Sequence, residues 1–205
     1  MNIMNNEKYL KWIMPSIKNR TVPHGIKNEQ FNFRVKMAEV QLKLYEEEKK
    51  KWCNEHPELS EQDWKDEHKK EIVKYVNDFL SSIMNMEEVE NPYIKPKNTK
   101  GRRIEYSKIN SIKKEDIVWI KFTKSGVISV IGTACDIYFT DFVENNTTAG
   151  RINQILNQKW DDTVVLVFPL MNIPDGLNRS DIESGIGNYL ISQGIPILDY
   201  YSHNY

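Results

Sequence analysis

The chain has 205 residues, of which 40 % are apolar and 28 % charged, and its formal net charge is −1. This composition is typical of one folded domain, with or without a helical appendage, and excludes a wholly disordered chain. No apolar run reaches the roughly 18 to 20 residues of a membrane helix, and the first residues lack a signal-peptide pattern. We therefore expect a cytoplasmic protein without a membrane partner, whose two cysteines are free thiols.

The small net charge hides a strong asymmetry along the chain. Residues 1–94 carry a net charge of −2, residues 95–124 carry +7, and residues 125–205 carry −6. Charges act locally, over about 8 to 10 Å in physiological salt, so the basic segment has its own field. We expect a polyanion partner, if there is one, at residues 95–124.

The first 90 residues show helical periodicity. A short amphipathic helix is expected at Tyr9 to Ile17, and a longer one at about residues 28–54, with its apolar stripe from Phe31 to Trp52. A third helix begins after Ser60, which is expected to cap the amide of Asp63. The pattern predicts an antiparallel helical hairpin.

Residues 91–111 are rich in Pro, Gly, Asn and Lys and are expected to form a basic linker. Beyond it, residues 116–123 and 127–131 alternate like a hairpin of strands around a turn at 124–126. Gly132 is expected to mark a bulge or a bend before the next strand. Strands at 134–140, 163–170 and 195–201 are predicted to alternate with helices at 147–159 and 180–193.

The predicted fold class is therefore α/β or α+β. The predicted domains are a helical region at 1–90, the linker at 91–111, and a mixed-sheet domain at 112–205 with a βαβαβ core at its C-terminal end.

Parallel strands would bring the loops after residues 140, 170 and 201 to one edge of the sheet, where ligands bind. We expect acid–base or orienting roles there for Glu183, His203 and Asp175. The expected ligand-binding residues are Arg179, Ser180, Asp181, Gly185, Gly187 and Asp141.

Two structural alternatives accompany this prediction. Gly185 and Gly187 are costly inside a helix, and they indicate either a closely approaching ligand or close packing of the helix on the sheet. Glu183 stands three residues after Ser180, a spacing that also predicts a capping box without catalysis.

The basic segment carries Tyr106 and Trp119 among its lysines and arginines, a pattern that suits phosphate contacts and base stacking. A solvated linker is the alternative. The expected nucleic-acid-binding residues are Lys100, Arg102, Arg103, Lys113, Lys114, Lys121 and Trp119.

Two functions follow from these patterns. The first is recognition of a nucleotide or nucleic-acid phosphate at the sheet edge, with hydrolase or transferase chemistry. The second is a non-enzymatic interaction protein, of the immunity, antitoxin or phage–host inhibitor type, that presents Trp52, Trp64 and the stripe between them to a protein partner. No metal-ligand spacing and no cofactor motif is found, so neither a metal nor a cofactor is expected.

Overall fold

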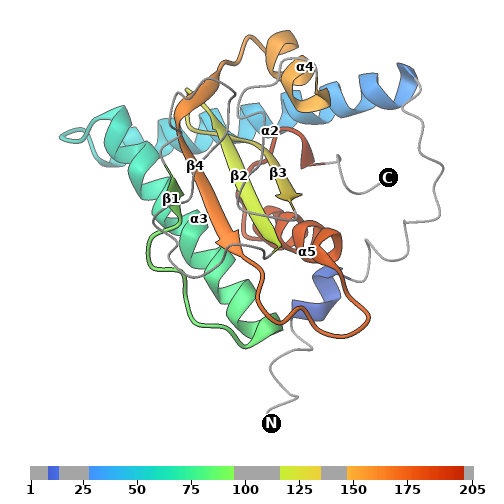
Figure 1. Ribbon diagram of the computed structural model, residues 1–205. Coiled ribbons are helices and arrows are strands. Elements are labelled where there is room, and N and C mark those ends of the chain that lie inside the picture. The colour runs from blue at the N-terminus through green and yellow to red at the C-terminus, as the bar shows by residue number, and fades with distance from the viewer. Residues whose placement is uncertain (1–8, 14–27, 95–115, 135–146, 201–205) are drawn as a thin grey trace, which may run out of the picture.

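The computed structural model describes residues 9–13, 28–94, 116–134 and 147–200. Residues 9–13 are helical. The remaining elements are α2 (Asn28–Glu55), α3 (Glu61–Met84), β1 (Tyr93–Ile94), β2 (Ile117–Thr123), β3 (Ile128–Ala134), α4 (Thr148–Ile155), β4 (Trp160–Pro169) and α5 (Arg179–Ser192). The fold is therefore α+β, with helices preceding a mixed α and β part (Figure 1). None of the described helices has an apolar stretch long enough to cross a membrane.

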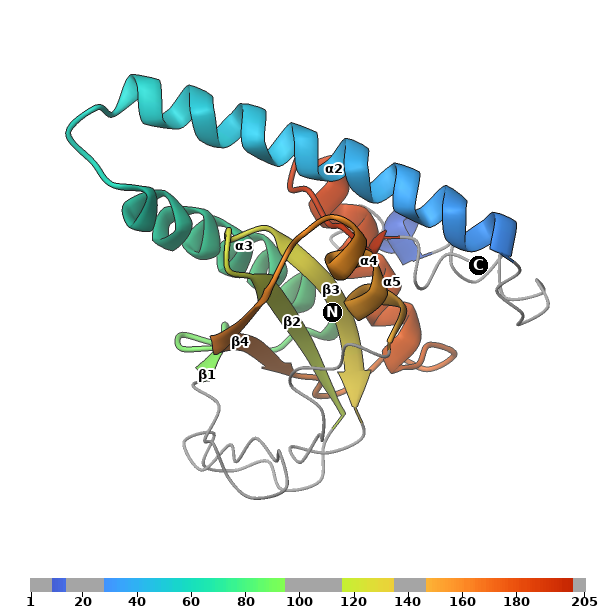
Figure 2. The ribbon, with the colours of Figure 1, turned by 90° about the horizontal axis from the view of Figure 1, so that it is seen from above.

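The predicted helical hairpin is present, and local chemistry defines its turn. The Ser60 hydroxyl accepts the amide of Asp63, while the Asp63 carboxylate accepts the amide of Ser60 at 2.8 Å. This reciprocal capping box satisfies two amides that would otherwise lack partners at the helix start. At the other end of α3, Asn85 adopts the left-handed conformation that ends helices. In both views the turn of the hairpin lies beyond the sheet (Figures 1 and 2).

The four strands form one sheet in the order β1-β4-β2-β3. Every pair of neighbouring strands is antiparallel. The predicted parallel βαβαβ core is not confirmed, because the predicted third strand, 195–201, contributes only a single parallel bridge between Ile197 and Ile128. Its apolar residues fill the core without forming a strand, so apolar character alone misled the prediction. The linker also contains β1, which pairs with β4.

One face of the sheet carries the main core. The predicted alternation of β2 is confirmed: Val118, Ile120 and Phe122 belong to one buried cluster with β3 and β4 residues. α3 and α5 cover this face, and the cluster takes in side chains from residues 9–13 as well. The same core thus contains residues from both sides of the predicted domain boundary.

The opposite face of the sheet includes a smaller cluster of Val130, Trp160 and α4 residue Ala149, with Trp119 packed against it. Gly132 lies opposite Trp119 in a regular antiparallel register, so the predicted bulge at Gly132 is wrong. A β-carbon on Gly132 would overlap the Trp119 indole. The glycine is therefore explained by an aromatic ring lying across the neighbouring strand.

Polar contacts fix α2 to the rest of the molecule. Arg34 donates two hydrogen bonds to one carboxylate oxygen of Asp199, at 2.6 and 3.1 Å, and both side chains are buried. Farther along, the Trp64 indole donates to the Tyr45 hydroxyl, which donates to the carbonyl of Ser125. A buried ion pair of this kind is costly to break from one side, so the Arg34–Asp199 contact holds the helix in place.

Candidate functional site

The sheet edge predicted to bind a ligand holds Arg179 and Asp175. The Arg179 guanidinium donates to the Asp116 carboxylate at 2.8 Å, with both groups about one-third exposed. Asp175 lies exposed in the loop between β4 and α5. No neighbouring strands are parallel, but β3 and β4 are each antiparallel to β2, so they run in the same direction and end at the same edge of the sheet. Ile197 continues this direction beside Ile128, while the strand predicted at 134–140 lies outside the described residues beyond Ala134.

The start of α5 forms a different cap from the predicted one. Asn178, and not Ser180, is the cap residue: its side chain accepts the amides of Ser180 and Asp181 at 2.9 and 3.3 Å. The buried Asp181 carboxylate returns the contact by accepting the amide of Asn178. The predicted Ser180–Glu183 capping box is therefore wrong by two residues. The amides of Ser180 and Asp181 are occupied by this cap, and the amide of Ile182 donates to the Asn178 carbonyl, so these three amides are already used within the helix start.

The two helix glycines differ. A β-carbon on Gly185 would lie 2.6 Å from the Phe79 ring and 2.7 Å from Ile13, so Gly185 allows α5 to approach α3 and residues 9–13 closely. Its packing is explained without a ligand. Gly187 has only Ile131, at 4.0 Å, near the position of a β-carbon.

Glu183 lines a small cavity between α5, β3 and residues 197–200. The cavity is also lined by Ser184, Gly187 and Asp199, and its volume is about 10 Å³. Glu183 itself is 3 % exposed. Such a volume holds about one water, whereas pockets for small-molecule ligands measure roughly 300 to 1,000 Å³. In this conformation the cavity does not admit a nucleotide.

Two residues of the predicted nucleic-acid strip belong to the described sheet. The Lys121 ammonium lies 4.5 Å from the Trp119 ring centroid and 5.7 Å from that of Trp160, and Lys121 is buried. Trp119 crosses Gly132. These contacts are structural ones within the sheet. The other predicted site residues, Lys100, Arg102, Arg103, Lys113, Lys114, Asp141 and His203, lie outside the described residues.

A second apolar row lies on α2, on a different side of the helix from the stripe that it buries. The buried stripe contains Ala38 and Tyr45, as the periodicity predicts. Val40 and Leu44 are each 48 % exposed and Phe33 is 43 % exposed. Val40 lies two positions from buried Ala38, while Leu44 is adjacent to buried Tyr45 and Phe33 to buried Arg34. At about 100° per residue, these offsets place the row roughly 100° to 160° around the helix from the buried stripe. We call Phe33, Met37, Val40 and Leu44 the outward row; Met37 is half-buried.

The aromatic residues near the turn of the hairpin pack against one another, and Trp64 lies inside this group. Trp64, predicted to face a partner, is buried: it stacks on His68 at 5.0 Å and contacts Tyr45 and Trp52. Neither ring nitrogen of His68 has a hydrogen-bond partner in the described structure. Burial, reinforced by the charge of Lys69, lowers the pKa of His68 from 6.5 to about 4.

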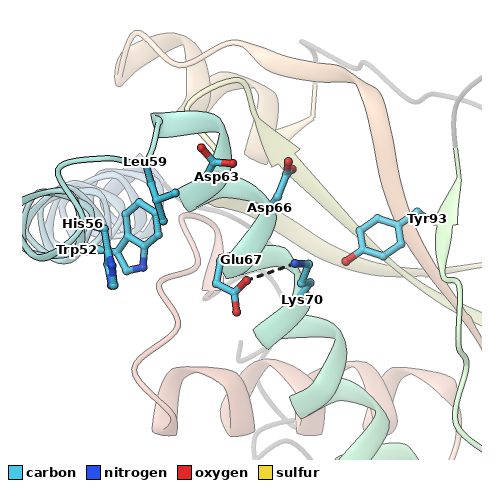
Figure 3. Close-up of a pocket in the computed structure, with 8 residues that line it drawn as sticks. All are labelled: Trp52, His56, Leu59, Asp63, Asp66, Glu67, Lys70 and Tyr93. Carbon is cyan, nitrogen blue, oxygen red and sulfur yellow. Dashed lines mark hydrogen bonds and ion pairs between the residues drawn. The ribbon is translucent and has the colours of Figure 1, made fainter.

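A wide depression lies on the solvent side of α3 near the hairpin turn (Figure 3). Its volume is about 780 Å³. The helix contributes a stripe at helical spacing, and the turn and β1 contribute mostly apolar and aromatic groups. We call this depression the tip groove; its lining residues are Trp52, His56, Leu59, Asp63, Asp66, Glu67, Lys70 and Tyr93.

No metal cluster is found in the part of the chain that the structure describes: no three His, Cys, Asp or Glu side chains there could share an ion. The chain matches no protein-family model, no curated protein and no solved structure.

Proposed function

We propose that the protein is a cytoplasmic, non-enzymatic interaction protein that binds a helical segment of a partner protein along the outward row of α2. One observation carries the proposal: α2 exposes Val40 and Leu44, one helical turn apart, on a side that it does not bury in the fold. Exposed apolar residues at three- and four-residue spacing are the anchors by which helices bind other helices.

The position of α2 supports this function. The helix runs along the outside of the molecule, with the sheet and the other helices on one side of it (Figure 2). Its inward side is fixed by the Arg34–Asp199 ion pair and by the Tyr45 contacts. A rigid helix loses little conformational entropy when a partner binds, which favours affinity.

The charges beside the outward row indicate the kind of helix that fits. Lys36 and Lys43 flank the row on one side, and both are exposed. Lys43 lies 3.7 Å from Glu47 across one helical turn, a weak exposed contact. We expect an amphipathic partner helix with acidic residues facing these lysines.

A second copy of the chain fits less well. An antiparallel copy that paired Phe33 with Leu44 would also pair Met37 with Val40, so the apolar row is self-complementary. The same arrangement brings Lys36 of one copy near Lys43 of the other, and like charges at such positions disfavour association. A different protein is therefore the proposed partner.

The test is selection from a displayed library of amphipathic helices, followed by affinity measurement on variants. We expect Val40→Asp together with Leu44→Asp to weaken the selected helices by about a hundredfold, since two apolar anchors are lost. Met171→Asp is the control, because Met171 is a similarly exposed apolar residue in the loop after β4.

Equal binding by both variants would refute the proposal, and so would a library that yields no helix above background. Sedimentation of the wild type tests the remaining possibility, which is that the chain associates with a second copy of itself. If the wild type forms a stable dimer and the double variant Val40→Asp with Leu44→Asp is a monomer, the occupant of the outward row is a second copy of the chain. This result would contradict the proposal.

A further inference from the structure

The tip groove is a second surface, separate from the outward row, and its lining combines two kinds of chemistry. Trp52 and Leu59 from the hairpin and Tyr93 from β1 supply apolar and aromatic surface (Figure 3). Leu59 and Tyr93 are 43 % and 37 % exposed. The stripe of α3 between them supplies Asp63 and Asp66, with other charged groups.

The α3 stripe follows from helical geometry. Asp63, Asp66, Glu67 and Lys70 are spaced by three, one and three residues, so they share one face of the helix. Three carboxylates thus stand beside a single ammonium, and Lys70 lies 3.3 Å from Glu67. Asp63 and Asp66 carry the net negative charge of the groove.

Both carboxylates are held in position. Asp63 accepts hydrogen bonds from the hydroxyl and the amide of Ser60, and these bonds lower the pKa of Asp63. Asp66 accepts a hydrogen bond from the side-chain amide of Gln62 at 2.9 Å. A fixed charge recognises a ligand better than a mobile one, because less side-chain entropy is lost on binding.

The negative field reaches across the groove to β1. Burial is the main reason that the pKa of the Tyr93 phenol is raised, and the charges of Asp66 and Glu67 raise it further. The same field that disfavours a phenolate favours a cation beside the Tyr93 ring.

The aromatic wall at the other side is rigid. The Trp52 ring packs on His56 at 4.7 Å and on the buried Trp64 at 5.6 Å. Trp64 is in turn fixed by its hydrogen bond to Tyr45. An aromatic ring braced in this way offers a ready surface for an apolar side chain or a guanidinium.

We propose that the tip groove binds a basic segment of a protein partner, with an apolar side chain against Trp52 and Leu59 and lysine or arginine side chains against Asp63 and Asp66. Charge complementarity selects this occupant, because an acidic segment would be repelled by the α3 stripe. The volume of about 780 Å³ accommodates several side chains.

The probe is a short fluorescent peptide of arginine, lysine and leucine, with a counterpart in which glutamate replaces each basic residue. We expect only the basic peptide to bind the full chain. Asp66→Lys with Glu67→Lys is expected to weaken binding about tenfold or more, and Leu59→Ala about threefold.

The matched control is Glu87→Lys with Glu88→Lys. It makes the same change in net charge on exposed residues just after α3, outside the groove lining. The proposal requires this control to bind like the wild type. Equal losses in both double variants would reveal unspecific charge attraction and overturn it, as would binding of the acidic peptide or of neither peptide.

These outcomes leave the proposed function separately testable. If the basic peptide does not bind the chain but a selected helix binds the outward row, only the groove proposal is refuted. If the basic peptide binds the groove but no helix from the library binds α2, only the function proposed for the outward row is refuted.

Discussion

The two ends of the described structure use polar and apolar residues in opposite ways. Around α5, the charged residues that were candidates for ligand binding make contacts within the fold: Arg179 pairs with Asp116, and Asp181 caps its own helix. Around the hairpin, residues that would normally be buried are exposed, including Val40, Leu44 and Leu59. The comparison teaches that a dense set of functional groups does not by itself indicate a site, because such groups can make contacts that serve the fold.

The largest expected effect tests whether the polar groups at the C-terminal end are structural. Asp199→Ala leaves Arg34 buried without its carboxylate, and we expect the free energy of unfolding to fall by about 3 to 5 kcal/mol. Urea denaturation measures this loss. Arg34→Met combined with Asp199→Ala is the control and should recover most of it, because no buried charge remains. A double variant no more stable than Asp199→Ala would contradict this account of the ion pair.

The next effect concerns the interior of the hairpin. An unfolded histidine takes up a proton below about pH 6.5, but folded His68 does so only near pH 4. Between these values the unfolded chain binds more protons, so stability falls as the pH falls, by about 3 kcal/mol for the full interval.

His68→Phe keeps a ring against Trp64 and removes two buried nitrogens without partners. We expect the variant to lose this part of the pH dependence and to match or exceed the wild type in stability at pH 7. Thermal unfolding of both proteins between pH 4 and 7 measures the difference, and parallel curves would show that His68 contributes nothing to it.

A smaller effect separates the two glycines of α5. Gly185→Ala should lower stability by about 2 kcal/mol, because the new methyl group overlaps Phe79 and Ile13. Gly187→Ala should raise it by about 0.5 to 1 kcal/mol, since the position is open and alanine favours the helix. Chemical denaturation of both variants provides an internal control. Destabilisation by Gly187→Ala would mean that this position also has a tight structural role.

Much of the fold could be predicted because it depends on local patterns. The alternation of Val118, Ile120 and Phe122 and the cap at Ser60 are properties of short segments, and both are confirmed. The strand predicted at 195–201 is wrong because an apolar run does not reveal whether it pairs in a sheet or only packs in a core.

The candidate site was harder to predict, since it depends on contacts distant in sequence. The role of Gly185 requires knowing that Phe79 and Ile13 lie against it. The outward row was missed because the periodicity of α2 identifies one apolar stripe and does not show that other apolar residues of the helix stay exposed. Trp64 was expected at a partner surface, yet its contacts with Tyr45 and His68 bury it.

The central claim is that a partner helix binds the outward row of α2. The most direct test measures amide hydrogen exchange of the full chain with and without a helix selected from the library, and so maps where that helix binds. We predict slower exchange along α2 around Val40 and Leu44, and unchanged exchange at Ser180 to Ile182. Protection at the start of α5 with none on α2 would contradict the account, because it would move the functional surface to the end of the molecule whose groups serve the fold.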